Sequence, residues 1–184
     1  MAKFVSVKVG TPKPVRLSYV TLTTPKKFAD GATAKYSAVL LIPKSDTETV
    51  KAIKKAAKEC FDSNPSVFKD YDFASKFDKI YDGDGRAPKG KKYGDEYAGF
   101  WVLNASNSRK PALRDKNGNE ILDESEIYSG CWAKVGLTIY AYNNSDCGLG
   151  VSLDLVKKVR DDEHFAGGGE AKEEDYFSDD DDDI

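Results

Sequence analysis

Residues 131–142, with the sequence CWAKVGLTIYAY, have the pattern of a β-strand with two different faces. Successive side chains of a strand point to opposite sides, so every second residue shares a face. One set is wholly apolar and suits a protein interior: Cys131, Ala133, Val135, Leu137, Ile139 and Ala141. The other set mixes rings, a cation and small residues: Trp132, Lys134, Gly136, Thr138, Tyr140 and Tyr142. We therefore expect one buried face and one outward aromatic face.

Further segments with strand-like composition and alternation lie at 4–9, 15–22, 35–42, 99–104 and 149–159. Between 35–42 and 99–104 the sequence predicts one helix, which begins with a Ser45-x-x-Glu48 capping box and ends before Asn64-Pro65. Its apolar stripe comprises Val50, Ile53, Ala57, Cys60 and Phe61. The helical spacing of these residues predicts that this stripe packs against the strands.

Short strands, a single well-capped helix and turn-rich connections predict a mainly β fold. We expect an OB-fold-like five-stranded barrel with one α-helix between strands, and a β-sandwich is the alternative. Residues 67–81 carry five aromatic residues among charges, without a clean period of two or 3.6. We interpret them as an ordered, aromatic-rich insertion whose rings pack against the barrel.

Charge divides the chain into two regions of opposite sign, although the formal net charge is only -3. Residues 161–184 contain 12 acidic residues and one basic residue, a net charge of -11. Residues 1–160 contain 27 basic and 19 acidic residues, a net charge of +8. We predict a folded domain over 1–160 and a flexible, disordered acidic C-terminal tail over 161–184, because repelling charges and glycines oppose ordering.

The predicted tail also contains apolar groups that a purely solubilising segment does not need. Tyr176, Phe177 and Ile184 lie among its acids and are candidate anchors for a partner protein. A flexible coil of this length spans about 25–30 Å, against a radius of about 15 Å for the body. The tail can therefore fold back and compete with a polyanion for the basic body, and simple solubilisation is the alternative.

Composition argues against several classes of activity. The chain has three cysteines, Cys60, Cys131 and Cys147, and no two of them form a Cys-x-x-Cys pair. We therefore expect buried free thiols rather than disulfides or a zinc site. His164 is the only histidine, which argues against nucleophile-base catalysis. We expect no enzyme activity, no catalytic residue, no cofactor and no metal. No window is apolar enough for a membrane helix and no hydrophobic leader begins the chain, so we expect an intracellular protein.

Two acidic motifs leave metal-dependent alternatives open. Residues 115–126 partly match a calcium-binding loop, but Glu120 stands where that loop needs glycine, and Asn117-Gly118 favours a hairpin turn. Asp82 and Asp84, separated by one glycine, could present carboxylates to magnesium in a nuclease. Spacing alone is weak evidence for that reaction, and a turn explains the pair more simply.

The outward face of residues 131–142 suits single-stranded nucleic acid. Rings stack on bases, a lysine meets phosphate, and a glycine permits close approach of the backbone. Basic residues also cluster in two predicted loops, at 86–92 and 109–114, where they could follow a phosphodiester backbone. The alternative is that a loop or insertion covers the aromatic rings of residues 131–142.

Together these segments resemble a bacteriophage family of OB-fold single-stranded DNA-binding proteins over most of the body. The resemblance rests, in chain order, on RLSY at 16–19, KYS at 35–37, LIPKSD at 41–46, DGD at 82–84, NA at 104–105, YSGCW at 128–132 and YAYNN at 140–144. It implies a protein of the infected host's cytoplasm that serves phage DNA replication or recombination. Acidic tails in similar phage proteins imply that this one recruits replication or recombination proteins.

We therefore predict non-catalytic, largely sequence-independent binding of single-stranded DNA, with a tail that competes with DNA and binds partners through Tyr176, Phe177 and Ile184. The sequence leaves open whether the chain forms a homo-oligomer. The predicted DNA contacts are Arg16, Tyr19, Lys35, Tyr36, Arg86, Lys92, Trp101, Arg109, Trp132, Lys134, Tyr140 and Tyr142. The alternatives are a metal-dependent nuclease at Asp82 and Asp84, and an interaction protein whose tail mimics nucleic acid.

Overall fold

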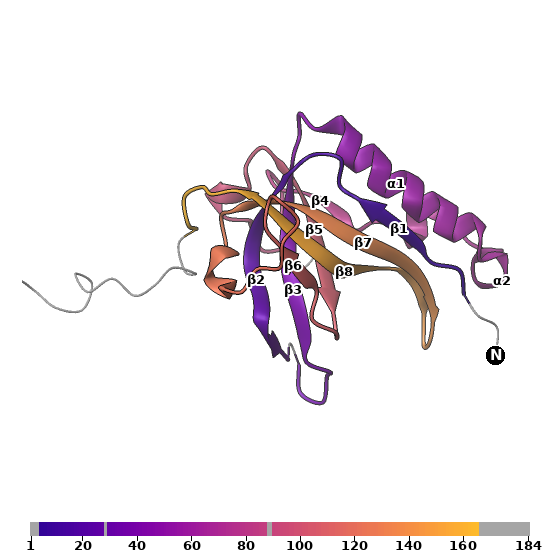
Figure 1. Cartoon of the computed structure of the whole chain (residues 1–184). Helices are drawn as coiled ribbons and strands as arrows, with labels where there is room; N and C mark the ends of the chain where they lie inside the picture. Colours follow the sequence, from indigo (N-terminus) through magenta and orange to yellow (C-terminus); the bar gives the residue numbers. More distant parts are fainter. Residues whose placement is uncertain (1–3, 28, 88–89, 166–184) are drawn as a thin grey trace, which may run out of the picture.

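Five strands form a closed ring in a computed structural model, which describes residues 4–27, 29–87 and 90–165 (Figure 1). Each pairs with the next in the order β2 (Val15–Lys26), β3 (Lys35–Pro43), β5 (Phe100–Asn107), β8 (Cys147–Arg160) and β7 (Trp132–Asn143). The ring closes through β7, which pairs with both β8 and β2. All these pairings are antiparallel except that of β5 with β8. The predicted OB-fold-like, five-stranded barrel is confirmed.

Three short strands extend the barrel at its edges. β1 (Val7–Gly10) pairs with β7, β4 (Ile80–Asp82) pairs with β5, and β6 (Ala112–Arg114) pairs with β8. Two 3-10 turns, η1 (Asp95–Tyr97) and η2 (Glu124–Glu126), lie in the connections. The hairpin of β2 and β3 and the hairpin of β7 and β8 extend from the barrel in different directions (Figure 1).

The inward face of β7 is the centre of the core. All six apolar residues that alternate over 131–141 are buried, as predicted from their spacing. They pack with inward residues of the other barrel strands, including Leu17, Leu40, Leu103 and Leu153. The outward residues of β7 are half-buried or exposed. The two predicted faces of this strand are therefore confirmed.

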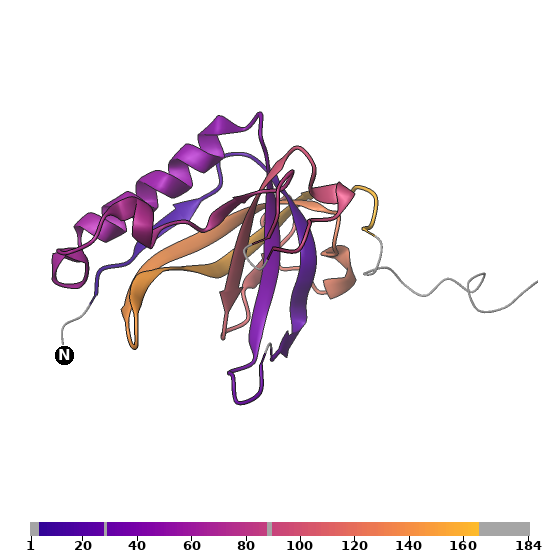
Figure 2. The ribbon, with the colours of Figure 1, turned by 180° about the vertical axis from the view of Figure 1, so that it is seen from behind.

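The predicted helix is α1 (Thr47–Asp62), which lies along β1 and β7 (Figure 2). Ile53, Ala57 and Cys60 of the predicted stripe are buried, and its other two members are half-buried against the same core. The predicted cap is wrong by one residue. Asp46, not Ser45, caps the helix, and its carboxylate accepts a hydrogen bond from the Thr49 backbone N–H. The cap therefore belongs to a buried Asp46–Thr49 pair.

The segment after α1 is ordered, as expected. It forms α2 (Pro65–Phe68) and α3 (Phe73–Lys76) before β4. Phe68 and Phe77 are buried in the barrel core, and Phe73 packs against it. Tyr71 is exposed, so the packing prediction holds for most of these rings and not for all.

The three cysteines are free and buried, as predicted from their spacing. Residues 115–119 form a tight turn, with Gly118 at φ +86° and the Asp115 carboxylate accepting hydrogen bonds from the backbone N–H groups of Asn117 and Asn119. This geometry confirms the predicted hairpin turn. The Asp115 carboxylate, the first of the calcium-loop pattern, is thus used to accept hydrogen bonds from the backbone of the turn. Within the described ranges, no helix is long and apolar enough to cross a membrane.

Candidate nucleic-acid interface

Three outward side chains form a row across neighbouring strands at one end of the barrel. Arg16 on β2 is paired with Trp132 on β7, which is paired in turn with Arg160 on β8. The Arg160 guanidinium lies 4.3 Å from the centre of the Trp132 indole ring. We call Arg16, Trp132 and Arg160 the Arg–Trp–Arg row. Two guanidinium groups beside an indole N–H form a site that suits an anion.

The carboxylate of Asp162 occupies this anion site. Its Oδ2 accepts a hydrogen bond of 2.8 Å from the Trp132 Nε1–H, and Arg16 and Arg160 lie 3.7 and 3.8 Å away from its oxygens. The hydrogen bond from Trp132, with the nearby arginines, lowers the pKa of the Asp162 carboxyl. Residues 161–165, the first five of the predicted tail, are therefore held against the body as an anion at neutral pH.

The same segment places rings beside its charges. The His164 ring stacks on Tyr128 at 3.8 Å and 8°, and the Phe165 ring lies 4.3 Å from the Arg16 guanidinium. Asp161 accepts hydrogen bonds from Lys158 and from the Tyr128 hydroxyl, and the Lys158 bond lowers its pKa. Carboxylates and flat rings thus contact the body in succession, as phosphates and bases of a single strand would.

Beyond the Arg–Trp–Arg row, the outward face of β2, β3 and β5 is partly covered. Tyr97 of η1 is buried on this face with Leu41 and Val102, and Tyr93 and Phe165 pack around them. The Tyr97 hydroxyl shares a hydrogen bond of 2.9 Å with Ser18. Burial raises the pKa of Tyr97 to about 12, so its hydroxyl stays neutral. The η1 turn therefore covers this part of the outward face.

Tyr19, which follows Ser18, is instead 72% exposed. The pairing of β2 with β3 shifts register between Ser18 and Thr21, and Tyr19 is the one non-glycine residue with positive φ among the described residues, at +45°. A β-bulge therefore turns this ring outward. Lys26 and Lys35 are paired further along the same two strands, and both are exposed.

Two tyrosines form a second aromatic surface on the hairpin of β7 and β8. The Tyr140 ring lies over Gly150, where an added Cβ would meet the ring at 2.2 Å, and Tyr142 lies over Gly148 in the same way. The two rings are 6.4 Å apart, and Tyr140 remains 38% exposed. Glycines therefore let both rings lie flat on the sheet, which leaves a ring face available for stacking.

The remaining predicted contacts lie in different surroundings. Tyr36 and Trp101 share the inward parity of their strands and pack, half-buried, against the core. Lys134, Arg86, Lys92 and Arg109 are exposed. Arg86 donates a hydrogen bond to the Gly90 carbonyl within its own loop. Tyr176, Phe177 and Ile184 lie outside the described residues.

Asp82 and Asp84, the proposed nuclease pair, bind one lysine between them. The Lys44 Nζ lies 2.6 Å from a carboxylate oxygen of each, and Asp84 also accepts a hydrogen bond from the Gly99 backbone N–H. An ammonium group thus lies between the carboxylates where a cation would bind. Within the described ranges no group of three or more acidic, histidine or cysteine side chains could hold a metal ion. We call Lys44, Asp82 and Asp84 the Lys44 clamp.

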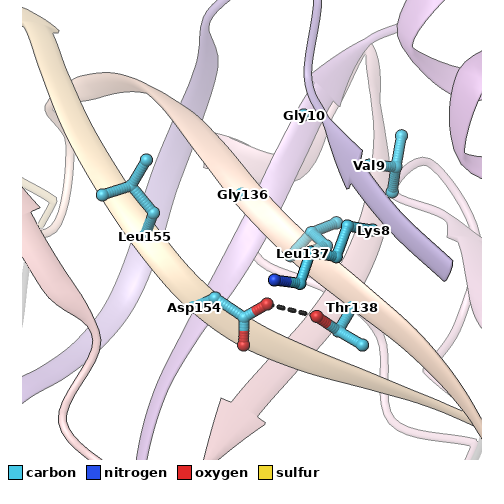
Figure 3. A pocket seen from close by; sticks show the side chains of 8 residues that line it. All are labelled: Lys8, Val9, Gly10, Gly136, Leu137, Thr138, Asp154 and Leu155. Carbon is cyan, nitrogen blue, oxygen red and sulfur yellow. Dashed lines mark hydrogen bonds between the residues drawn. The ribbon is translucent and has the colours of Figure 1, made fainter. Parts of the chain in front are cut away.

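A separate hollow of about 500 Å³ lies on the outward side of β1, β7 and β8 (Figure 3). Its walls include Gly136, Leu137 and Leu155, and Lys8 is the one cationic side chain among the described residues that line it. Asp154 lies in the same hollow and accepts a hydrogen bond from the Thr138 hydroxyl (Figure 3). One lysine and one carboxylate give this surface no excess of positive charge, so it is less suited to a polyanion than the Arg–Trp–Arg row.

Sequence reasoning missed Tyr128, Lys158 and Arg160, which complete the site around Trp132. The alternation of β8 could have placed Arg160 outward, but its register against Trp132 is a tertiary property. Reasoning from composition also assigned residues 161–165 to a flexible tail able to fold back on the body, and the structure places these five residues against the body.

A five-stranded barrel whose outward face combines arginines with aromatic rings has the architecture of OB-fold proteins that bind nucleic acid chains. Residues 6–184 match the family described as the Enterobacter phage Enc34 ssDNA-binding protein. The chain belongs to this family. That family is one of DNA-binding proteins rather than enzymes, in agreement with the expectation that the chain is not an enzyme.

Individual relatives agree with this assignment. Protein p50 of Acyrthosiphon pisum secondary endosymbiont phage 1 is 32% identical over 160 residues, which cover 83% of this chain and 84% of p50. The bacteriophage Enc34 single-stranded DNA-binding protein, solved in complex with ssDNA, is 30% identical with a TM-score of 0.66, over 89% of this chain and 96% of that one. The gp2.5 protein of bacteriophage T7, at 17% identity and a TM-score of 0.54 over 94% and 99%, shares the fold.

Acid should remove the stabilising effect of the Lys44 clamp. The hydrogen bond from Lys44 lowers the pKa of both Asp82 and Asp84 in the folded protein. Their contribution is therefore complete above the unfolded value of about 3.9 and is lost as the pH falls through the folded values. Asp82→Asn combined with Asp84→Asn should lower the Tm at pH 7, and the difference from the native chain should shrink towards pH 2. Thermal melts that keep the same difference at both pH values would contradict this.

Proposed function

We propose that this chain binds single-stranded DNA without catalysis and largely without regard to sequence, with residues 1–160 as the binding domain. The observation that carries the proposal is the Arg–Trp–Arg row, an anion site beside aromatic rings. The strand would place a phosphate where the Asp162 carboxylate now lies. It would continue over Tyr19, Lys26 and Lys35 on the β2–β3 side and over the Tyr140 and Tyr142 rings of the other hairpin.

The acidic segment 161–184 is proposed to compete with DNA for this surface. Residues 161–165 contact three members of the site through Asp162, so DNA and the segment cannot both occupy the Arg–Trp–Arg row. The remainder of the segment, with Tyr176, Phe177 and Ile184, is proposed to recruit replication or recombination proteins once DNA has displaced it. Membership of a phage family supports a role in protecting and organising single strands in the cytoplasm of an infected bacterium.

Salt should weaken DNA binding, because counterions released from the strand drive part of the association. The slope of log K against log salt should be about -0.7 for each neutralised phosphate. Lys35→Gln should make the slope shallower by about that amount. Lys116→Gln, in the exposed turn after β6, serves as a matched control and should leave the slope unchanged. Fluorescence anisotropy with mixed-sequence oligonucleotides measures both, and undetectable binding even at low salt would refute the proposed function.

Removing charge from the segment on the row should strengthen DNA binding. Asp161→Asn combined with Asp162→Asn keeps side-chain size and removes the two carboxylates that bind Lys158 and the Arg–Trp–Arg row. Affinity should rise, most at low salt where screening is weakest. Glu59→Gln combined with Asp70→Asn is the matched control, because it removes two exposed carboxylates outside the segment and changes the net charge equally. An equal rise in both double variants would show a general charge effect instead of local competition.

A further inference from the structure

A second recess lies on the outward face of β2, β3 and β5, next to Tyr19. It has a volume of about 410 Å³, near the lower end of the range of about 300–1,000 Å³ typical of small-molecule sites. The strand register arranges its floor in two rows. Val39 is paired with Asn104, and Ser37 is paired with both Thr21 and Ser106. We call this recess the Tyr19 cleft.

The shape of the Tyr19 cleft follows from its small side chains and from the bulge. Serine, threonine and valine leave the floor low, and Tyr19 forms one wall. Ser18, which bonds to the buried Tyr97 hydroxyl, is paired with Val39 of the cleft. The volume of the cleft, about 410 Å³, suits one nucleotide unit.

The backbone at Tyr19 is strained in a way that folding alone does not explain. A tyrosine at φ +45° is unfavourable, and glycine or asparagine would adopt this conformation more easily. The ring is 72% exposed, so its burial does not offset that cost. Strain of this kind is concentrated at binding sites, where it orients a side chain. Here it holds an aromatic ring beside the Tyr19 cleft.

The side chains of the cleft can form hydrogen bonds with the edge of a nucleic-acid base. Asn104 is exposed on its floor, and its amide offers both a donor and an acceptor, the combination that pairs with the edge of a base. The hydroxyls of Ser37 and Ser106 lie in the neighbouring row. Lys26 lines the same cleft and supplies a cation for the adjoining phosphate. The hollow of Figure 3 lacks this combination, because the described residues that line it include Lys8 and Thr138 but no aromatic ring and no amide side chain.

We propose that the Tyr19 cleft accepts one unstacked base of the bound single strand, stacks it on Tyr19 and reads its edge through Asn104. This inference rests on the proposed function and adds to it a local base preference in a protein that otherwise binds strands of any sequence. Asn104 is then a specificity residue, and Tyr19 a stacking residue held in place by its bulge.

The test compares the affinities of the full-length chain for dT, dC and dA homopolymers of equal length. The native chain should bind them unequally, and a bidentate contact predicts a preference of roughly 5- to 150-fold for the best-matched base. Asn104→Leu keeps the side-chain size and removes the amide, so the three affinities should converge towards equality. Asn119→Leu, at an exposed turn outside the cleft, should leave the preference intact.

If Asn104→Leu binds DNA with the native ratios among the three homopolymers, the inference is overturned although the proposed function stands. If the native chain binds none of them, the proposed function itself fails. The two failures are therefore distinguishable within one set of titrations.

Tyr19→Gly provides an independent arm, because glycine relieves the positive φ and removes the ring. We expect a Tm equal to or above that of the native chain together with a roughly 5- to 150-fold loss of DNA affinity, the effect of one stacked base. A lower Tm with unchanged affinity would show that Tyr19 serves the fold and would overturn its role in the cleft.

Discussion

The alternation of side chains along β7 is the constraint on which both the core and the candidate interface depend. Its apolar residues must face inward to fill the barrel. The residues between them therefore face outward. Because β7 pairs with both β2 and β8, that outward set is aligned with their side chains. Trp132 consequently lies between Arg16 and Arg160. A slip of one residue would bury the rings and expose the core.

Local periodicity explains which features could be predicted from the sequence. The two faces of β7 and the stripe of α1 repeat over a few residues, so they were readable without tertiary information. The inward position of Tyr36 was equally readable, since it shares the parity of Ala38 and Leu40. The contact of Arg16 with residues 162–165 joins positions about 150 apart in the chain, and the bulge at Tyr19 depends on pairing with β3. Neither has a local sequence pattern.

Electrostatics connects the two oppositely charged regions of the chain. Asp162 lies where three side chains provide one indole N–H and two guanidinium groups. The neighbouring Asp161 forms an ion pair with Lys158. A phosphate carries the same charge and accepts the same hydrogen bonds, so it can replace a carboxylate at this place. The stacking of His164 on Tyr128 adds a flat ring, as a base would. The segment therefore has both chemical features that the proposed ligand uses.

Exchange of residues 161–165 for DNA at the Arg–Trp–Arg row is tested most directly by the NMR resonance of the Trp132 indole N–H. This N–H donates a hydrogen bond to the Asp162 carboxylate in the free protein. Displacement of the segment must therefore change the environment of the indole proton. Titration of the full-length chain with single-stranded DNA should shift the resonance in step with binding, and Asp162→Asn should alter its position before any DNA is added. A Trp132 resonance that stays fixed while the chain becomes saturated with DNA would contradict the exchange.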